Sequence, residues 1–135
     1  MIRFQKLIFS PQEEINAKVI IKNTGKFPDK DTELITYLKS PNDTIYSYSK
    51  DVFFQVDVGE SEIKIKKQLP PSSKLGEWKM IAEYITFDQP IITAEASFFV
   101  ITKTQTITIA TSLIAATSII IIILARKRYT IAQVL

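Results

Sequence analysis

The side chains that could carry out chemistry are hydroxyls, carboxylates and amines, because the 135 residues include no histidine and no cysteine. A disulfide and any metal site built on thiolate or imidazole are therefore excluded. Ser–His and Cys–His nucleophiles are excluded with them, and no Gly-x-Ser-x-Gly turn is present. No pair of the fourteen Asp and Glu residues can be assigned acid and base roles, since such roles depend on burial or a close neighbour. We therefore predict a non-enzyme with no cofactor and no small-molecule substrate.

Carboxylates alone do not predict a metal site either. Asp29, Asp31 and Glu33 occupy alternate positions, as acidic ligands do at the start of a calcium loop. The glycine and the distal glutamate that complete the calcium-loop pattern do not follow at the required positions. The spacing favours solvated loop carboxylates, and no metal is expected.

One modification motif is present. Asn42, Asp43 and Thr44 form an N-glycosylation sequon within a predicted turn that begins at Ser40-Pro41. Asparagine and aspartate are also the residues that an unmodified turn prefers. Glycosylation of Asn42 is thus expected only if this part of the chain lies outside the cell.

A membrane anchor is predicted near the end of the chain. Residues 106–125 are about twenty residues without charge, proline or glycine. As a helix they would span roughly 30 Å, the thickness of the hydrocarbon core of a bilayer. About one hundred residues precede this stretch, too few to surround such a helix as the core of a globular domain. We therefore predict a single transmembrane helix.

The flanking charges predict the orientation of that helix. Arg126, Lys127 and Arg128 follow it at once, whereas only Lys103 lies close before it. Excess Lys and Arg mark the cytoplasmic side, which places residues 1–105 outside. Residues 1–9 lack the apolar region and cleavage site of a signal peptide, however. Two arrangements remain open: an external domain from a longer precursor, which we favour, and a tail-anchored domain in the cytosol.

The basic pI of about 9.1 also arises from the three cations that follow the predicted helix. Of seventeen basic residues, three form this topology cluster, and the remaining fourteen equal the fourteen acidic residues. The whole net charge of +3 therefore belongs to the tail, where it can attract anionic lipid headgroups. Nucleic acid is not predicted as a partner, whereas membrane lipid is.

The predicted helix also carries a stripe of small residues. Thr108, Ser112 and Ala116 recur at every fourth position, with Ala115 beside them. Such a stripe lets another transmembrane helix approach closely. Serine and threonine can equally bond back to carbonyls of their own helix, which requires no partner. We favour a helix–helix contact.

Hydrophobic alternation predicts β-structure before the anchor. Apolar residues recur at every second position in several short segments, and turn residues separate the segments every eight to twelve residues or so. This spacing indicates a mainly β domain, an antiparallel β-sandwich. The predicted inward rows are residues 15, 17, 19 and 21; 52, 54, 56 and 58; 63 and 65; 78, 80, 82 and 84; and 94, 96, 98 and 100.

Several short phrases occur in an order that resembles a known group of modules. They are KNTG at 22–25, LKSPND at 38–43, VGES at 58–61, LPP at 69–71 and LGEW at 75–78. Over residues 14–101 the order is similar to that of immunoglobulin-like modules of prokaryotic, especially archaeal, surface proteins, of the CARDB and macroglobulin types. The resemblance implies a spacer, adhesive or docking module without enzymatic activity or a fixed ligand.

A partner surface is expected on the outer face of the same strands. The apolar residues that fall there are Ile35, Tyr37, Phe53, Ile81 and Phe99. If they cluster, they form an exposed patch that can bind another protein. A shift of one residue in any strand would exchange its two faces, so the clustering cannot be decided at this level.

We therefore expect four parts: an immunoglobulin-like β-sandwich at 1–101, a linker at 102–105, a transmembrane helix at 106–125 and a cytoplasmic tail at 126–135. The predicted function is non-catalytic, as the anchor end of a surface protein or an accessory subunit of a membrane complex. The alternative is a tail-anchored cytosolic domain that recruits a partner to the membrane.

Overall fold

The computed structural model describes residues 1–87 and 89–102, which form eight β-strands and no helix. The predicted anchor, its basic cluster and its small-residue stripe lie outside these residues. Within the described part of the chain, no helix is long and apolar enough to cross a bilayer. The strands are β1 Ile2–Phe4, β2 Ile8–Phe9, β3 Glu14–Asn23, β4 Asp29–Lys39, β5 Ile45–Val56, β6 Gly59–Gln68, β7 Gly76–Ile85 and β8 Ile92–Val100.

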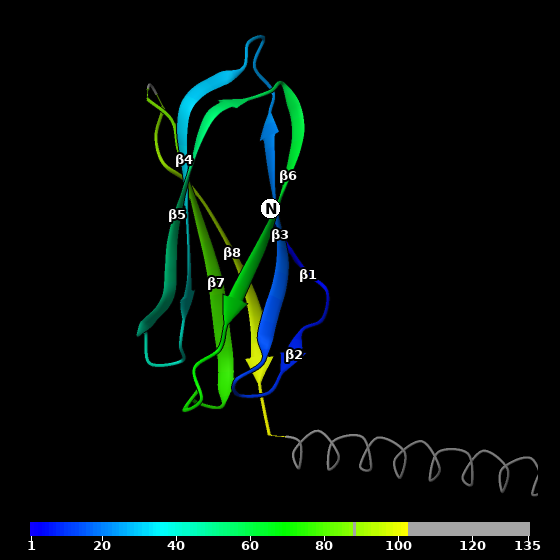
Figure 1. The fold of residues 1–135 in the computed structure, drawn as a ribbon, viewed down its shortest axis with the longest axis vertical. Coiled ribbons are helices and arrows are strands. Elements are labelled where there is room, and N and C mark those ends of the chain that lie inside the picture. The colour runs from blue at the N-terminus through cyan, green and yellow to red at the C-terminus, as the bar shows by residue number, and fades with distance from the viewer. Residues whose placement is uncertain (88, 103–135) are drawn as a thin grey trace, which may run out of the picture. The chain divides into compact units, whose positions relative to one another are not determined.

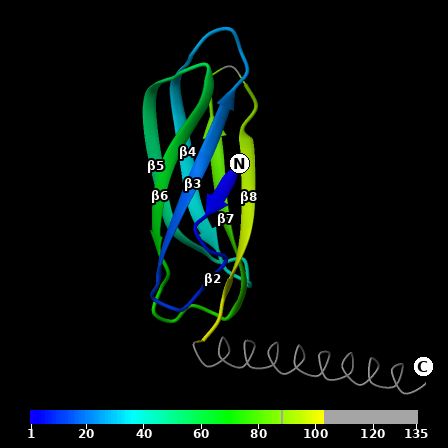
Figure 2. The same ribbon diagram turned by 90° about the vertical axis from the view of Figure 1, so that its right-hand side faces the viewer.

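The strands form two sheets that pack face to face (Figures 1 and 2). The smaller sheet has the order β1-β3-β6 and the larger has the order β2-β8-β7-β4-β5. Neighbouring strands are antiparallel except β2 and β8, which are parallel. This architecture confirms the predicted β-sandwich.

The core fills the space between the sheets with alternate residues of each strand. In β3, every second side chain from Ile15 to Ile21 is buried, as the hydrophobic alternation predicts. Leu34 and Leu38 of β4 and the inward residues of β7 meet them from the larger sheet. The fully buried side chains include Ile15, Leu34, Leu38, Leu69, Trp78, Met80, Phe98 and Val100.

Aromatic rings concentrate in the half of the core where β7 begins and β8 ends. Trp78 lies between Tyr46 and Phe98, with ring centroids 5.4 and 6.4 Å away. Phe4 and Phe9 each contact Phe98 edge to face at 5.4 Å. Edge-to-face and offset rings add to the stabilisation that their buried area supplies. This half of the sandwich is therefore densely filled.

The prediction that residues 52, 54, 56 and 58 face the core is wrong for all but Val56. Val52 and Phe54 are 68% and 77% exposed, whereas Phe53 packs against the core. The cause is a bulge at Ser47, which has a positive φ of 55° and lies where the pairing with β4 shifts by one residue. A bulge exchanges the two faces of a strand, and a second irregularity at Asp31 of β4, with a positive φ of 50°, lies between the pairs of Phe53 and Gln55. Of the predicted row, only Val56 is buried.

A charged side chain also lies in the core. Lys67 of β6 is only 4% exposed, and its Nζ reaches across to the larger sheet. It donates hydrogen bonds to the carbonyl oxygens of Thr36 at 3.0 Å and Ser47 at 2.6 Å, and to Ser49 Oγ at 2.5 Å. A buried carbonyl without a donor is costly, and Lys67 supplies a donor to each of these two carbonyls. Lys67 therefore joins the two sheets at the bulge.

Replacing Lys67 with methionine should lower the stability of the sandwich. The variant keeps an unbranched side chain but leaves the Thr36 and Ser47 carbonyls without a donor, at a cost of about 1–3 kcal/mol in the free energy of unfolding. Urea unfolding of the full chain in detergent measures this difference. A variant as stable as the wild type would show that the ammonium group contributes nothing to holding the sheets together.

The free energy of unfolding should also depend differently on pH in the wild type and in Lys67→Met. Burial lowers the pKa of Lys67 below its ordinary value of 10.5, although the charge of Asp51 opposes this effect. Between the lowered pKa and 10.5 the unfolded chain binds more protons than the folded one, so stability rises with pH in that window. The wild type should therefore gain stability relative to Lys67→Met as pH rises toward about 10.5. A difference that falls over this range would contradict the pKa shift.

Candidate interaction surface

The outer face of the five-stranded sheet brings together part of the predicted partner surface. Ile35 and Tyr37 of β4 lie beside Ile81 of β7, and Tyr37 is directly paired with Ile81. Their neighbours in sequence, such as Leu34 and Leu38, point into the core. Three of the five predicted residues therefore share one face.

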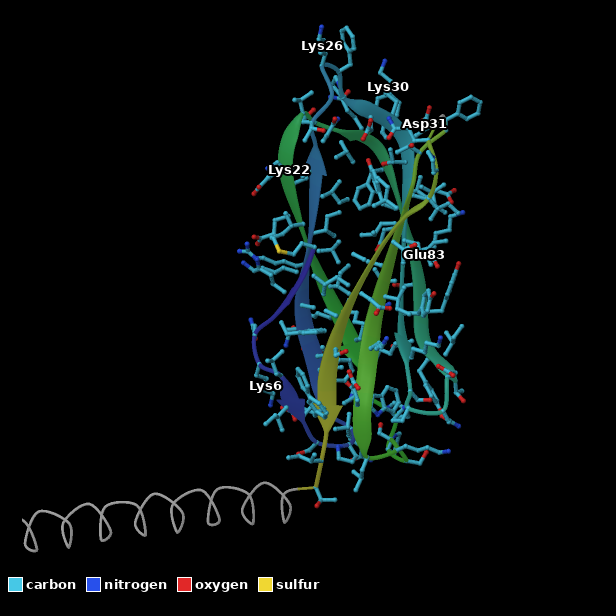
Figure 3. The ribbon with its side chains drawn as sticks, turned by 180° about the vertical axis from the view of Figure 1, so that it is seen from behind. Lys6, Lys22, Lys26, Lys30, Asp31 and Glu83 are labelled. Atoms are coloured by element: carbon cyan, nitrogen blue, oxygen red, sulfur yellow. The ribbon has the colours of Figure 1, made fainter. Side chains whose placement is uncertain are left out.

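Hydrogen bonds and ring stacking fix Tyr37 at the centre of this face. Its ring stacks on Tyr48 with centroids 6.4 Å apart, and its hydroxyl donates to Glu83 Oε1 at 3.1 Å. Burial and this contact with the Glu83 carboxylate raise the pKa of Tyr37 above 10.0. Figure 3 shows Glu83 on the side of the sheet that faces away from β3. The ring is thus held in place and half-buried before any partner binds.

Ion pairs border the apolar residues. Lys50 contacts Glu33 at 2.7 Å, and Lys79 contacts Glu95 at 3.0 Å. Their side chains lie on the same face and shield Ile81, which is only 7% exposed. Exposed pairs of this kind contribute little to stability, but they break an apolar surface into small areas. The outer face is therefore largely covered by its own charged side chains.

The other two predicted residues lie elsewhere. Phe53 faces the core because of the bulge at Ser47, so it is not part of the outer face. Phe99 is 48% exposed, but it pairs with Ile8 of β2 at the far end of β8, apart from Tyr37. Three of the five residues therefore share one face and the other two lie elsewhere, and binding of a partner at this face stays a prediction.

The predicted modification site lies in an exposed turn between β4 and β5. Asn42 is exposed, and its Oδ1 accepts a hydrogen bond from the hydroxyl of Ser40. The Ser40 hydroxyl also accepts from the Thr44 amide at 3.1 Å, and the Asp43 amide donates to the Ser40 carbonyl at 2.9 Å. The sequon is sterically accessible, and its glycosylation stays a prediction.

The acidic side chains of the described residues do not form a cluster of metal ligands. Among residues 1–87 and 89–102, no three acidic side chains approach closely enough to hold a metal ion. The predicted helix contact at Thr108, Ser112, Ala115 and Ala116 and the topology cluster Arg126, Lys127 and Arg128 lie beyond the residues that the structure describes. Both stay predictions.

Sequence reasoning missed two features of the interior. Lys67 continues the inward series of Ile63 and Ile65 at period two, so strict alternation would have placed it in the core. The second feature is a cavity of about 890 Å³ at one open side of the sandwich. In the sequence, this cavity is indicated by Ala82 and Ala94, two small residues at inward positions of neighbouring strands.

Comparison with known proteins identifies solved structures that have a similar fold. A scan against models of protein families found no match, and neither did a search of curated proteins. Among solved structures, the sporulation control protein Spo0M of Bacillus subtilis matches 74% of this chain with a TM-score of 0.53 and 15% identity. The chain spans about half, 47%, of the Spo0M chain.

A second solved structure is a CARDB domain from Pyrococcus furiosus, described in complex with di-metal ions. It matches 74% of this chain and 84% of its own length, with a TM-score of 0.52 and 14% identity. These likenesses confirm the predicted immunoglobulin-like sandwich of the CARDB type. At this level of identity they concern the fold alone.

The burial of the outer face leads to a testable difference between Ile81 and Phe99. Ile81→Ala should lower the free energy of unfolding by about 2 kcal/mol, since it removes a side chain that its neighbours enclose. Phe99→Ala removes a larger side chain but should cost less than about 1 kcal/mol, because half of that side chain is exposed. Urea unfolding of both full-length variants gives the comparison, and the reverse order would contradict the assignment of covered and open residues.

Proposed function

We propose that the protein is a non-catalytic, membrane-anchored docking module whose β-sandwich lies outside the cell. The observation that carries the proposal is the uncharged segment 106–125, which begins a few residues after the last strand ends at Val100 and is followed by three cations. A domain that ends so close to a membrane span is held near the bilayer surface.

The direction of β8 supports the same proposal. Three connections, β3–β4, β5–β6 and β7–β8, lie at the end of the sandwich where β8 begins. The chain leaves at the opposite end, about 30 Å away along the nine residues of β8. These three loops therefore lie at the end of the β-sandwich opposite Val100.

The likeness to a CARDB domain is consistent with a docking or structural role, although it concerns the fold alone. The alternative is a tail-anchored domain in the cytosol. The two arrangements differ in which side of the membrane holds the sandwich.

Protease protection on intact cells distinguishes them. An epitope tag inserted in the exposed turn between Ser40 and Asp43 should be removed by external protease without lysis. A tag that survives until the cells are lysed would place the domain in the cytosol. As a matched control, a second tag after Leu135 should be protected in the first case.

The small-residue stripe predicts an effect on assembly. Ser112→Ile together with Ala116→Ile should reduce the amount of any membrane protein that co-purifies in mild detergent, because larger side chains prevent close helix approach. Ile120→Leu with Ile122→Leu is a control within the same segment. Equal recovery from the stripe variant and the control would leave the stripe without a role in binding.

A further inference from the structure

One side of the sandwich is open along half of its length. β6 pairs with all of β3, from Glu14 to Asn23, whereas β1 pairs only with Ala17–Val19 on the other edge. On the larger sheet, β2 covers only Phe99 and Val100 of β8. In Figure 1, β1 and β2 lie beside the half of β3 near its start. We call the opening between β3 and β8 the lateral groove.

The lateral groove is a cavity of about 890 Å³. Its floor is apolar and includes Val19, Ile21, Leu34 and Tyr84. Ala82 and Ala94, which pair directly across β7 and β8, also line it. Their methyl groups leave space that larger residues would fill, and native cores rarely leave such space empty. The volume is within the range of pockets that bind ligands.

Backbone groups along β8 border the groove without partners. The amides of Phe99 and Ile101 donate to β2 and its flank at 2.8 and 2.9 Å, which shows which residues of β8 face this edge. Because a strand alternates its hydrogen-bonding direction, Thr93, Glu95 and Ser97 present amides and carbonyls to the same edge. Among the described residues, no backbone partner meets these three.

This edge carries one charged side chain, Glu95, which is paired with Lys79. On the opposite side of the sandwich, β5 carries the bulge at Ser47, and β6 has Lys64 and Lys66 exposed along it. The pairing of β7 with β8, in contrast, is regular from Ile92 to Val100. The edge of β8 is therefore flat, regular and open.

Strand β1, at the edge of the smaller sheet, shows which shape of chain fits beside this opening. It is an extended segment on β3 whose alternate residues Ile2 and Phe4 pack against the core. The backbone of Met1, next to β1, exchanges two hydrogen bonds with Ile20 at 2.7 and 2.9 Å and lines the groove. An extended chain is therefore the shape that this edge of β3 already holds.

We propose that the lateral groove binds an extended strand of a partner protein, which pairs with β8 and inserts large apolar side chains at alternate positions over Ala82 and Ala94. Only a peptide backbone supplies donors and acceptors at the spacing of Thr93, Glu95 and Ser97. The proposal gives the chemistry of the partner for the docking function above, and therefore rests on that function for its biological setting.

Residues at the mouth of the groove add to the description of the partner. Phe27 is 78% and Ile92 57% exposed, and both line the cavity. Lys26 lies beside them at the loop end of the sandwich (Figure 3), and no described acidic residue pairs with it. Asn23 holds this loop through a hydrogen bond to the Phe27 carbonyl at 3.0 Å. A strand that enters here meets apolar contacts and a lysine that is not paired with any acidic side chain among residues 1–87 and 89–102, which favours an acidic residue at its end.

A second copy of the chain fits this groove less well. Two β8 edges related by a twofold axis would pair antiparallel. The inward residues of β8, Ala94 and Ala96, are too small to fill the cavity of a partner copy. We therefore assign the groove to a strand of a partner protein.

Proline at the free edge tests the proposal. The amide of Glu95 points to the groove, so Glu95→Pro removes no hydrogen bond within the sandwich but blocks an added strand. Glu95→Ala is the matched control, because both variants lose the ion pair with Lys79 and only one loses the amide. Ser97→Pro with Ser97→Ala repeats the comparison at a residue without an ion pair, in case the first proline impairs folding.

The probe is a labelled peptide of about nine residues that alternates leucine with threonine and ends in two aspartates, a pattern suited to strand addition. Its binding to the full chain in detergent is measured by fluorescence anisotropy. The wild type and the alanine variants should bind it, and the proline variants should bind about tenfold more weakly or worse. A peptide with serine in place of leucine should not bind.

Three outcomes would overturn the proposal. They are no binding to the wild type, equal binding to the proline and alanine variants, and a dimer of the chain that Glu95→Pro dissociates. Lys22→Pro identifies the edge that is used: unchanged binding supports β8, whereas loss with Lys22→Pro alone would place the strand on β3. Peptide binding does not depend on membrane orientation, so its failure is distinct from failure of the protease-protection test.

Discussion

The contact of the Lys67 ammonium group with the bulged edge of the opposite sheet is the constraint around which the sandwich is arranged. Three hydrogen bonds of 2.5 to 3.0 Å connect β6 to β4 and β5 across the core. A buried lysine is tolerated only when its donors are satisfied, and carbonyls at a bulge are tolerated only when they find donors. The buried Lys67 and the bulge at Ser47 therefore depend on each other. The bulge in turn sets which residues of β5 face the core.

The two halves of the sandwich differ in how completely they are filled. Where β8 ends, Trp78, Phe98 and the rings around them occupy the interior, and β1 and β2 close the side. Where β8 begins, Ala82 and Ala94 leave a cavity and the edge of β8 is open. Dense packing therefore fills the half of the sandwich where β8 ends. The open half offers apolar surface and unpaired backbone groups, which are the two properties that strand recognition requires.

Exposed apolar side chains are a weaker guide to the partner surface than backbone pairing in this protein. The outer face of the larger sheet holds Ile35, Tyr37 and Ile81, but the ion pairs of Lys50 and Lys79 divide and cover it. At the lateral groove, by contrast, the amides and carbonyls of β8 have a defined direction and spacing. A directional set of donors and acceptors specifies one class of occupant, whereas scattered apolar residues do not.

The sequence by itself determined the class of the fold, because hydrophobic alternation is a local property of each strand. The inward rows of β3, β7 and β8 and the burial of Trp78 follow from period two alone. The absence of histidine and cysteine likewise excluded whole classes of chemistry without any coordinates. Only the tertiary structure decided the faces of β5, the role of Lys67 and the position of the lateral groove. A bulge at Ser47 reverses a strand's faces without a clear signal in residue types, and a groove exists only through strands that end early beside longer ones.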